Sequence, residues 1–343
     1  MLYVPVVDYD QTPLMPTTPS RARRWVKENK ATPFFKGGVF CVRLNKEPSG
    51  RTLQPIAVGI DPGSKREGLT VKSEAHTYLN ILATAVTWVK DSMKTRRAMR
   101  KGRRFRGSPC RKNKTNRSMG VLAPSVKSRW QWKLRLCRWL KKMFCISAFV
   151  VENVKAISIG VKRWDVNFSA VEMGKNWFYG ELSREGRVIL VPAVTTKALR
   201  SEFGLKKSHN KGSRSFSAHC VDSWVLANFY VGGHDKPEHR DTLIVVPLHI
   251  YRRRLHYLQP SSGGSRSAYG GSMSLGFKRG SIVKHKTKGL SFIGGTSNGR
   301  ISLHRFSSGK RFCQNARPED VRFLAYNSWR TEFAPGTRQR IIR

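Results

Sequence analysis

The chain has 343 residues, enough for two or three compact units of ordinary size. It contains 65 Lys and Arg against 21 Asp and Glu, a formal net charge of +44, and 39% of its residues are hydrophobic. Such a charge favours a polyanionic partner, nucleic acid before a membrane surface. No apolar run approaches the length of a transmembrane helix. The six cysteines are scattered without a C-x-x-C pair, which argues against a zinc site or a disulfide scaffold and favours a reducing compartment.

Residues 1–91 read as two strand-rich segments. In residues 1–52, the strand-like runs LYVPVVD and GVFCVRL flank a basic helix that Thr18 can cap and Pro19 can begin. Residues 53–91 contain the runs PIAVGID, REGLTVKS and ILATAVTWV, joined by short loops. Three such runs in succession predict an antiparallel meander.

Residues 92–118 change character, because no acid occurs between Asp91 and Glu152. A block of like charge is often a solvated segment. Here Met99 and Phe105 punctuate a run of good helix formers, which favours an Arg-rich helix ordered against nucleic acid.

Residues 119–232 alternate helix and strand patterns. PSVKSRWQWKLRLCRWLKKMF predicts an amphipathic helix with a basic outer face, and SFSAHCVDSWVLANFYV predicts a second helix. ISAFVVENV and RVILVPAV are typical of buried parallel strands. From residue 233 to 343 the chain becomes Gly/Ser-rich and then gives short strand-like pieces, which predict a small β-barrel with basic loops. The fold class is therefore α/β.

Three acids stand inside apolar runs, where an unpaired carboxylate is costly. Asp61 ends IAVGID, Glu152 follows FVV, and Asp222 lies on a predicted helix, with His219 three residues earlier on the same expected face. Carboxylates that converge can bind Mg²⁺, and two such ions can catalyse phosphodiester cleavage. We expect Asp61, Glu152 and Asp222 to be metal ligands and His219 to complete the catalytic set.

Each of these residues also has an ordinary structural interpretation. An Asp before Pro-Gly is most often a turn former, and Glu152 could pair with an Arg. His219 could be a hydrogen-bonded core histidine, and Asp222 a local helix cap. The nuclease hypothesis depends on the four residues being taken together.

The same residues resemble a known family. GIDPGS, VVEN and SFSAHCVDSWVLA resemble the three motifs of RuvC-type nucleases, which have an RNase H-like fold. PLMP, residues 13–16, and the basic helix after it resemble the N-terminal module of transposon-encoded IscB and IsrB proteins. Residues 92–118 resemble their bridge helix. IYRRRLHYLQPSSGG and GFKRGSIV resemble their tail, which is implicated in contacts with guide RNA and the target-adjacent motif.

One departure favours IsrB within that family. IscB carries an HNH nuclease domain between its second and third RuvC motifs, but here only 66 residues separate Glu152 from His219. The resemblance implies a PLMP module (1–52), a first RuvC part (53–91), a bridge helix (92–118), further RuvC parts (119–232) and a C-terminal β domain (233–343). TnpB is disfavoured, because zinc-type cysteine pairs are missing.

The resemblance implies an RNA-guided DNA nickase that cleaves the displaced strand in a Mg²⁺-dependent reaction, with Mn²⁺ as a possible substitute. Its partners would be a long non-coding guide RNA and double-stranded DNA with a short target-adjacent motif, in a monomeric ribonucleoprotein of the prokaryotic cytoplasm, associated with the nucleoid and not with a membrane. The expected nucleic-acid contacts are Arg96, Arg97, Arg100, Lys101, Arg103, Arg104, Arg106, Arg252, Arg253 and Arg254.

Two other classes remain open at this stage. A guide-independent, structure-specific nuclease such as a junction resolvase would use the same carboxylates without RNA. A basic RNA-binding protein of ribosomal type would explain the charge but not the three embedded acids. Metal-dependent cleavage that is lost on changing an acid separates the nucleases from the second class.

Overall fold

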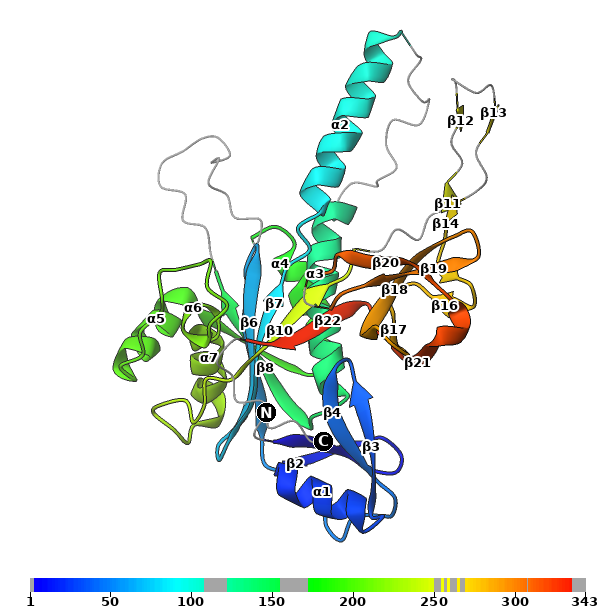
Figure 1. Ribbon diagram of the computed structural model, residues 1–343. Coiled ribbons are helices and arrows are strands. Elements are labelled where there is room, and N and C mark those ends of the chain that lie inside the picture. The colour runs from blue at the N-terminus through cyan, green and yellow to red at the C-terminus, as the bar shows by residue number, and fades with distance from the viewer. Residues whose placement is uncertain are drawn as a thin grey trace, which may run out of the picture. The chain divides into compact units, whose positions relative to one another are not determined.

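The structure is a computed structural model that describes residues 3–107, 122–154, 172–249, 271–306 and 308–334, with the backbone of short strand pieces between 254 and 270. The chain forms two compact units, Met1–Ile244 with Phe333–Arg343, and Val245–Glu332. The division falls at 244 rather than at the composition change near 233. The fold is mixed α/β, as the sequence predicts (Figure 1). In the described part of the chain, no helix is long and apolar enough to cross a membrane.

The N-terminal segment is a four-stranded sheet, in the order β2-β1-β4-β3, with one helix. Its elements are β1 (Val4–Val7), β2 (Pro13–Thr17), α1 (Pro19–Lys27), β3 (Ala31–Lys36) and β4 (Val39–Leu44).

The PLMP tetrapeptide lies in the edge strand β2, a position that tolerates proline because one side of the strand needs no ladder hydrogen bonds. Thr18 caps α1 by accepting a hydrogen bond from the Arg21 amide at 3.4 Å, as predicted. Ala22 of α1 packs into the small core that Val6 and Val42 provide.

The central sheet has seven strands in the order β22-β10-β7-β6-β5-β8-β9. They are β5 (Ile56–Asp61), β6 (Arg66–Ser73), β7 (Thr77–Thr84), β8 (Ile146–Asn153), β9 (Arg187–Pro192), β10 (Thr242–Pro247) and β22 (Trp329–Phe333). The antiparallel meander β5-β6-β7 is confirmed, but its third strand lies at Thr77–Thr84 rather than in the expected run 81–89. The strand β8 runs parallel to both β5 and β9. β9 is parallel as predicted but not buried: it forms the edge, and Leu190 is 41% exposed.

Helices cover both faces of this sheet, α3 (Pro124–Lys141) on one face and α6 (Phe216–His219) with α7 (Val221–Val231) on the other. Neighbouring residues of β6 point to opposite faces. Glu67 pairs with Lys133 of α3, whereas Gly68 lies under the His219 carbonyl of α6. The helix α7 follows α6 on the same face. Also present are α4 (Lys175–Ser183) and α5 (Ala193–Glu202).

One predicted helix is broken in two. The run SFSAHCVDSWVLANFYV forms α6 and α7, separated at Cys220, whose backbone leaves ideal helical geometry at φ −108° and ψ −4°. His219 is therefore the last residue of α6, and Asp222 is the second residue of α7.

The Arg-rich helix α2 runs from Val89 to Phe105, so it begins before residue 92. None of its residues is buried, and Phe105 is 92% exposed. Figure 1 shows it as a single uninterrupted helix. Residues 108–118 of the expected bridge segment lie outside the described residues.

The second unit contains a five-stranded antiparallel sheet in the order β20-β19-β18-β17-β21, around a core that includes Val283, Ile293 and Leu303. Among the described residues no pairing joins β20 to β21, so the expected barrel is an open sheet here. Its strands are β17 (Ser281–His285), β18 (Gly289–Ser297), β19 (Arg300–His304), β20 (Arg311–Ala316) and β21 (Val321–Tyr326). Shorter elements are β11 (Arg254–Leu255), β12 (Leu258–Gln259), β13 (Gly264–Ser265), β14 (Tyr269–Gly270), β15 (Met273–Ser274), β16 (Phe277–Lys278) and the 3₁₀ turn Pro318–Asp320.

Candidate active site

Two of the predicted acids lie at the same end of two parallel strands. Ile60 of β5 is in register with Val151 of β8, so Asp61 and Glu152 follow side by side at the carboxyl ends of these strands. This edge is where the parallel part of an α/β sheet usually carries its functional groups. On the other side of Asp61, its cross-strand partner is Gly68, which has no side chain to fill the space beside the carboxylate.

The third acid, Asp222, reaches this edge because α7 lies directly on the sheet. A Cβ added to Gly59 would fall 1.9 Å from the Ser223 carbonyl oxygen. A Cβ added to Gly68 would fall 2.0 Å from that of His219. Only glycine permits so close an approach. Gly59 and Asp61 share one face of β5. Asp222, the residue before Ser223 on α7, is therefore brought to the end of the strand where Asp61 lies.

The three carboxylates interact electrostatically. Burial, followed by the charges of Asp61 and Asp222, raises the pKa of Glu152 to about 8. Glu152 is 8% exposed and Asp222 4% exposed. A buried carboxyl group that stays protonated near neutral pH is typical of a site that accepts a cation or a proton.

Two basic residues that the sequence analysis did not single out contact the acids. The Lys207 ammonium lies 3.3 Å from Asp61 Oδ2 and in close contact with Asp222 Oδ2. Arg200 Nη1 lies 2.5 Å from Asp222 Oδ1. Burial opposes the charge of Lys207, but Asp61 and Asp222 raise its pKa overall, so the ammonium form is the one present.

Among the described residues, no hydrogen bond or ion pair links the His219 side chain to the three acids. Its Nε2 lies 3.1 Å from the Ser213 carbonyl oxygen, to which it can donate. Burial, and then the positive charge of Arg66, lowers the pKa of His219 and favours the neutral ring. The ring is thus hydrogen-bonded and mostly buried.

A second charged pair lies beneath the site. Lys133 of α3 contacts Glu67 at 2.6 Å, and the two side chains are 5% and 1% exposed. Lys133 also donates to the Gly63 carbonyl at 3.2 Å, in the turn that follows Asp61. No sequence pattern indicated this pair, because a single Lys in a basic amphipathic helix reads as part of its outer face.

The expected nucleic-acid contacts fall into two groups. Arg252 and Arg253 lie outside the described residues, and for Arg254 only the backbone of β11 is described. The others belong to α2 and its C-cap, where all are exposed or half-buried: Arg96, Arg97, Arg100, Lys101, Arg103, Arg104 and Arg106.

The acids supply the donor chemistry that Mg²⁺ prefers, oxygen ligands from side chains that would otherwise repel one another. Among the described residues, no group of three or more His, Cys, Asp and Glu side chains already has metal-binding geometry. The positive charges at the cluster are those of Lys207 and Arg200. An ammonium between Asp61 and Asp222 indicates a place where a cation is stabilised, so the residues fit a divalent ion that replaces it.

Part of the chain matches a known protein family. A search of curated proteins found none similar to this chain. Residues 4–160 match the model of a family described as RRXRR protein, a domain found in proteins of the IscB and IsrB type. The matched range begins with β1 and includes Asp61, α2 and Glu152.

Proposed function

We propose that this protein is a metal-dependent DNA endonuclease with an RNase H-like, RuvC-type core, guided by a long non-coding RNA to nick the displaced DNA strand. The observation that carries the proposal is the convergence of Asp61, Glu152 and Asp222 from β5, β8 and α7 at one edge of a mixed sheet. The match of residues 4–160 to the RRXRR family, a domain of nuclease-related proteins of the IscB type, supports it.

In the proposed reaction, Asp61, Glu152 and Asp222 hold Mg²⁺. The bound metal would activate water and stabilise the negative charge that develops on the phosphate. Burial, and then the charges of Asp61 and Asp222, raise the pKa of Glu152, so this carboxyl would release its proton to solvent if a cation were bound beside it. Arg200 stays with Asp222 and fixes the orientation of that carboxylate.

The proposal of a nick rather than a double-strand break rests on the short interval between Glu152 and the helix of Asp222. The described part of that interval, residues 172–218, forms α4, β9, α5 and α6, and these elements continue the central sheet and its cover. With a single nuclease centre, the expected product is a nick in one strand. A guide RNA would deliver sequence recognition by base pairing, while the protein binds backbone phosphates.

The test uses full-length protein with the RNA that co-purifies with it, sequenced to identify the guide. A duplex that matches the guide is labelled separately on each strand and incubated with Mg²⁺. We expect a single nick in the displaced strand, lost in Asp61→Asn with RNA binding unchanged, and retained in the surface control Glu202→Gln.

Other outcomes separate the alternatives. Cleavage without RNA favours a guide-independent nuclease. RNA binding without cleavage in Mg²⁺ or Mn²⁺ favours a non-catalytic RNA-binding protein. Efficient cutting of both strands by the monomer contradicts a nickase.

A further inference from the structure

Lys207 sits where a cation shared by two of the acids would sit. Its ammonium is within contact distance of Asp61 Oδ2 and Asp222 Oδ2, two carboxylates that come from a strand and a helix far apart in the sequence. Arg200 differs, since among the described residues its ion pair is with Asp222 alone. Lys207 is therefore the positive charge that links the strand-borne Asp61 to the helix-borne Asp222.

The backbone around Lys207 is fixed. The Leu205 amide donates to the Arg200 carbonyl at 3.0 Å, and the Ser208 amide donates to the Ser217 carbonyl at 2.8 Å. The side chain is a flexible four-carbon stem, and it is 22% exposed. The ammonium can thus leave the cluster by a change of rotamer, without opening the loop that carries it.

A metal ion bound to the same two oxygens would compete with this ammonium. Mg²⁺ binds carboxylate oxygens at about 2.0–2.1 Å, and the ammonium already contacts one oxygen of each acid. A cation that binds both of these oxygens would compete with the Lys207 nitrogen for the space between them. Both charges are positive, so their repulsion adds to the steric conflict.

We propose that Lys207 is a built-in, displaceable counter-ion, which holds Asp61 and Asp222 together in the metal-free protein and competes with the divalent cation for the same position. The inference rests on the proposed metal-dependent function. Lys207 sets how tightly the site binds metal and keeps the acids assembled until metal arrives. It is a positioning residue, because it acts through the carboxylates.

The test measures metal binding directly, with Mn²⁺ as the probe and full-length protein freed of metal by chelation. Lys207→Met keeps the length of the side chain and removes its charge. We expect Lys207→Met to bind Mn²⁺ about tenfold more tightly than the wild type in titration calorimetry, because a competing positive charge is gone. The matched control is Lys206→Met, the exposed neighbour, which should bind Mn²⁺ as the wild type does.

Thermal unfolding gives an independent readout. Without metal, Lys207→Met should unfold at a lower temperature than the wild type, because its acids lose their shared counter-ion. Saturating Mn²⁺ should raise its Tm by more than it raises that of the wild type. If Lys207→Met does not fold without metal, Lys207→Gln takes its place in the same measurements. Alternatively, Lys207→Met is purified in Mn²⁺, and its rate of Mn²⁺ release is compared with that of the wild type.

The variant Asp61→Asn distinguishes failure of the counter-ion proposal from failure of the metal site itself. If Asp61→Asn weakens Mn²⁺ binding while Lys207→Met and Lys207→Gln leave it unchanged, the counter-ion proposal is wrong and the metal site stands. If Asp61→Asn leaves Mn²⁺ binding unchanged, the metal site itself is wrong, and the proposed nuclease function falls with it.

Discussion

Two glycines decide whether the acids can meet. Gly59 and Gly68 lie on neighbouring strands, under the Ser223 and His219 carbonyls. Any side chain there would push the helices α6 and α7 away from the sheet and carry Asp222 away from Asp61. Gly68 is also the cross-strand neighbour of Asp61. The geometry of the site thus depends on residues that contribute no functional group.

Gly59→Ala should therefore destabilise the protein and weaken metal binding at once. Adding a methyl group to a core that has no space for it lowers the free energy of unfolding by about 1–3 kcal/mol. Here the atoms that the methyl would meet belong to the backbone, which cannot rotate aside. Gly180→Ala is the control: this exposed position on α4 has nothing within 4 Å of an added Cβ. It should gain up to about 1 kcal/mol from helix propensity. Urea unfolding measures the free energy of unfolding of both variants. Equal changes in Gly59→Ala and Gly180→Ala would contradict the packing argument.

The buried pair Lys133–Glu67 gives a second prediction at the residue scale. Burial raises the pKa of Glu67, and Lys133 opposes that shift. Lys133→Met should cost about 3–5 kcal/mol, because it leaves a buried acid without its partner. Adding Glu67→Gln to Lys133→Met should recover much of the loss. Chemical denaturation of the two variants tests this, and a double variant no more stable than the single one would show that the ion pair is not the cause.

At the scale of elements, the sequence predicted most of the central sheet and its helices. The runs that became β5, β6 and β8 are short, apolar and rich in β-branched residues, and Asp61 and Glu152 stood out because they interrupt such runs. β2 and β3 were not foreseen, since prolines obscure a strand pattern that tertiary pairing imposes.

The break at Cys220 was not predictable either, because the run from Phe216 to Val231 contains no Gly or Pro and reads as one helix. In the candidate site, the three acids could be identified from the sequence, but the basic residues that contact them could not. Lys207 and Arg200 are two among 65 basic residues, and only the fold brings them to Asp222.

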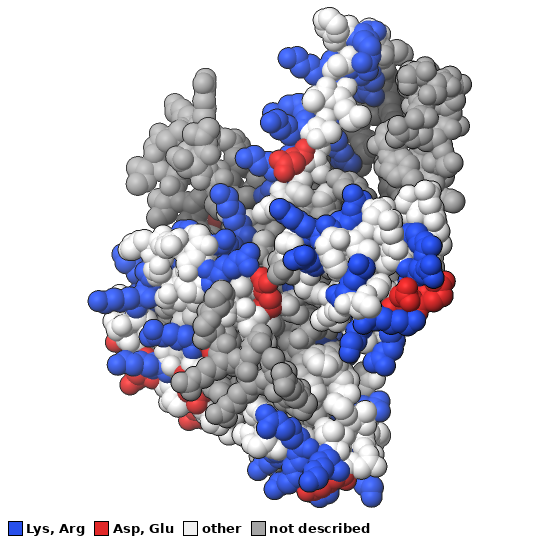
Figure 2. Space-filling view, viewed as in Figure 1, with Lys and Arg blue, Asp and Glu red and all other residues white. Residues whose placement is uncertain are grey.

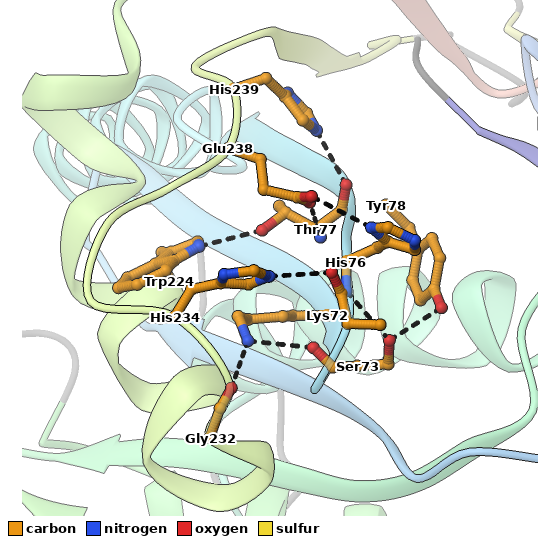
Figure 3. Close-up of polar contacts among 11 residues, drawn as sticks. Lys72, Ser73, His76, Thr77, Tyr78, Trp224, Gly232, His234, Glu238 and His239 are labelled. Carbon is orange, nitrogen blue, oxygen red and sulfur yellow. Dashed lines mark hydrogen bonds and ion pairs between the residues drawn. The ribbon is translucent and has the colours of Figure 1, made fainter.

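The segment after α7 is fastened across the β6–β7 hairpin by a polar network (Figure 3). Glu238 accepts hydrogen bonds from the Thr77 amide at 2.7 Å and pairs with His76 at 3.0 Å. His234 and His239 bind the carbonyls of Ala75 and Thr77. Lys72 Nζ donates to the Gly232 carbonyl at the C-terminal end of α7. These contacts hold the chain in place between α7 and β10.

This network predicts a loss of stability in acid. Burial alone would raise the pKa of Glu238, but the hydrogen bonds from His76 and the Thr77 amide lower it below its ordinary value of 4.5. A lowered carboxyl pKa stabilises the fold above pH 4.5, and this contribution is lost as pH falls through the folded-state pKa.

Tm measured from neutral pH down to about pH 3 should therefore fall less steeply below pH 4.5 in Glu238→Gln than in the wild type. The exposed control Glu202→Gln should follow the wild-type curve. Parallel curves for Glu238→Gln and the wild type would mean that this carboxylate contributes nothing to the segment.

At the scale of the whole molecule, the net charge of +44 is spread widely. Figure 2 shows Lys and Arg over much of the visible surface, with Asp and Glu in small groups. The helix α2 is the extreme case. It has one acid, Asp91 in its first turn, and none of its residues is buried. A helix of this kind is not held by a protein core along its length, which favours a polyanion as the partner that orders it.

The last prediction concerns four arginines of α2, Arg96, Arg97, Arg100 and Arg103, changed together. In the Ala variant, affinity for the co-purified RNA should fall, and its dependence on salt should flatten by roughly one unit of slope for each lost phosphate contact. In the Lys variant the salt slope should persist, because charge is kept. Guided nicking should nevertheless weaken, since Lys lacks the planar, bidentate fork that positions phosphates.

The Lys variant is the charge-matched control for the Ala variant. Filter binding over a range of salt concentrations, beside strand-specific nicking at fixed ionic strength, separates charge from geometry. Affinity and slope that do not change in the Ala variant would mean that α2 is a solvated charged helix. The positive charge that binds RNA would then have to lie elsewhere in the chain, and α2 would have no part in the proposed function.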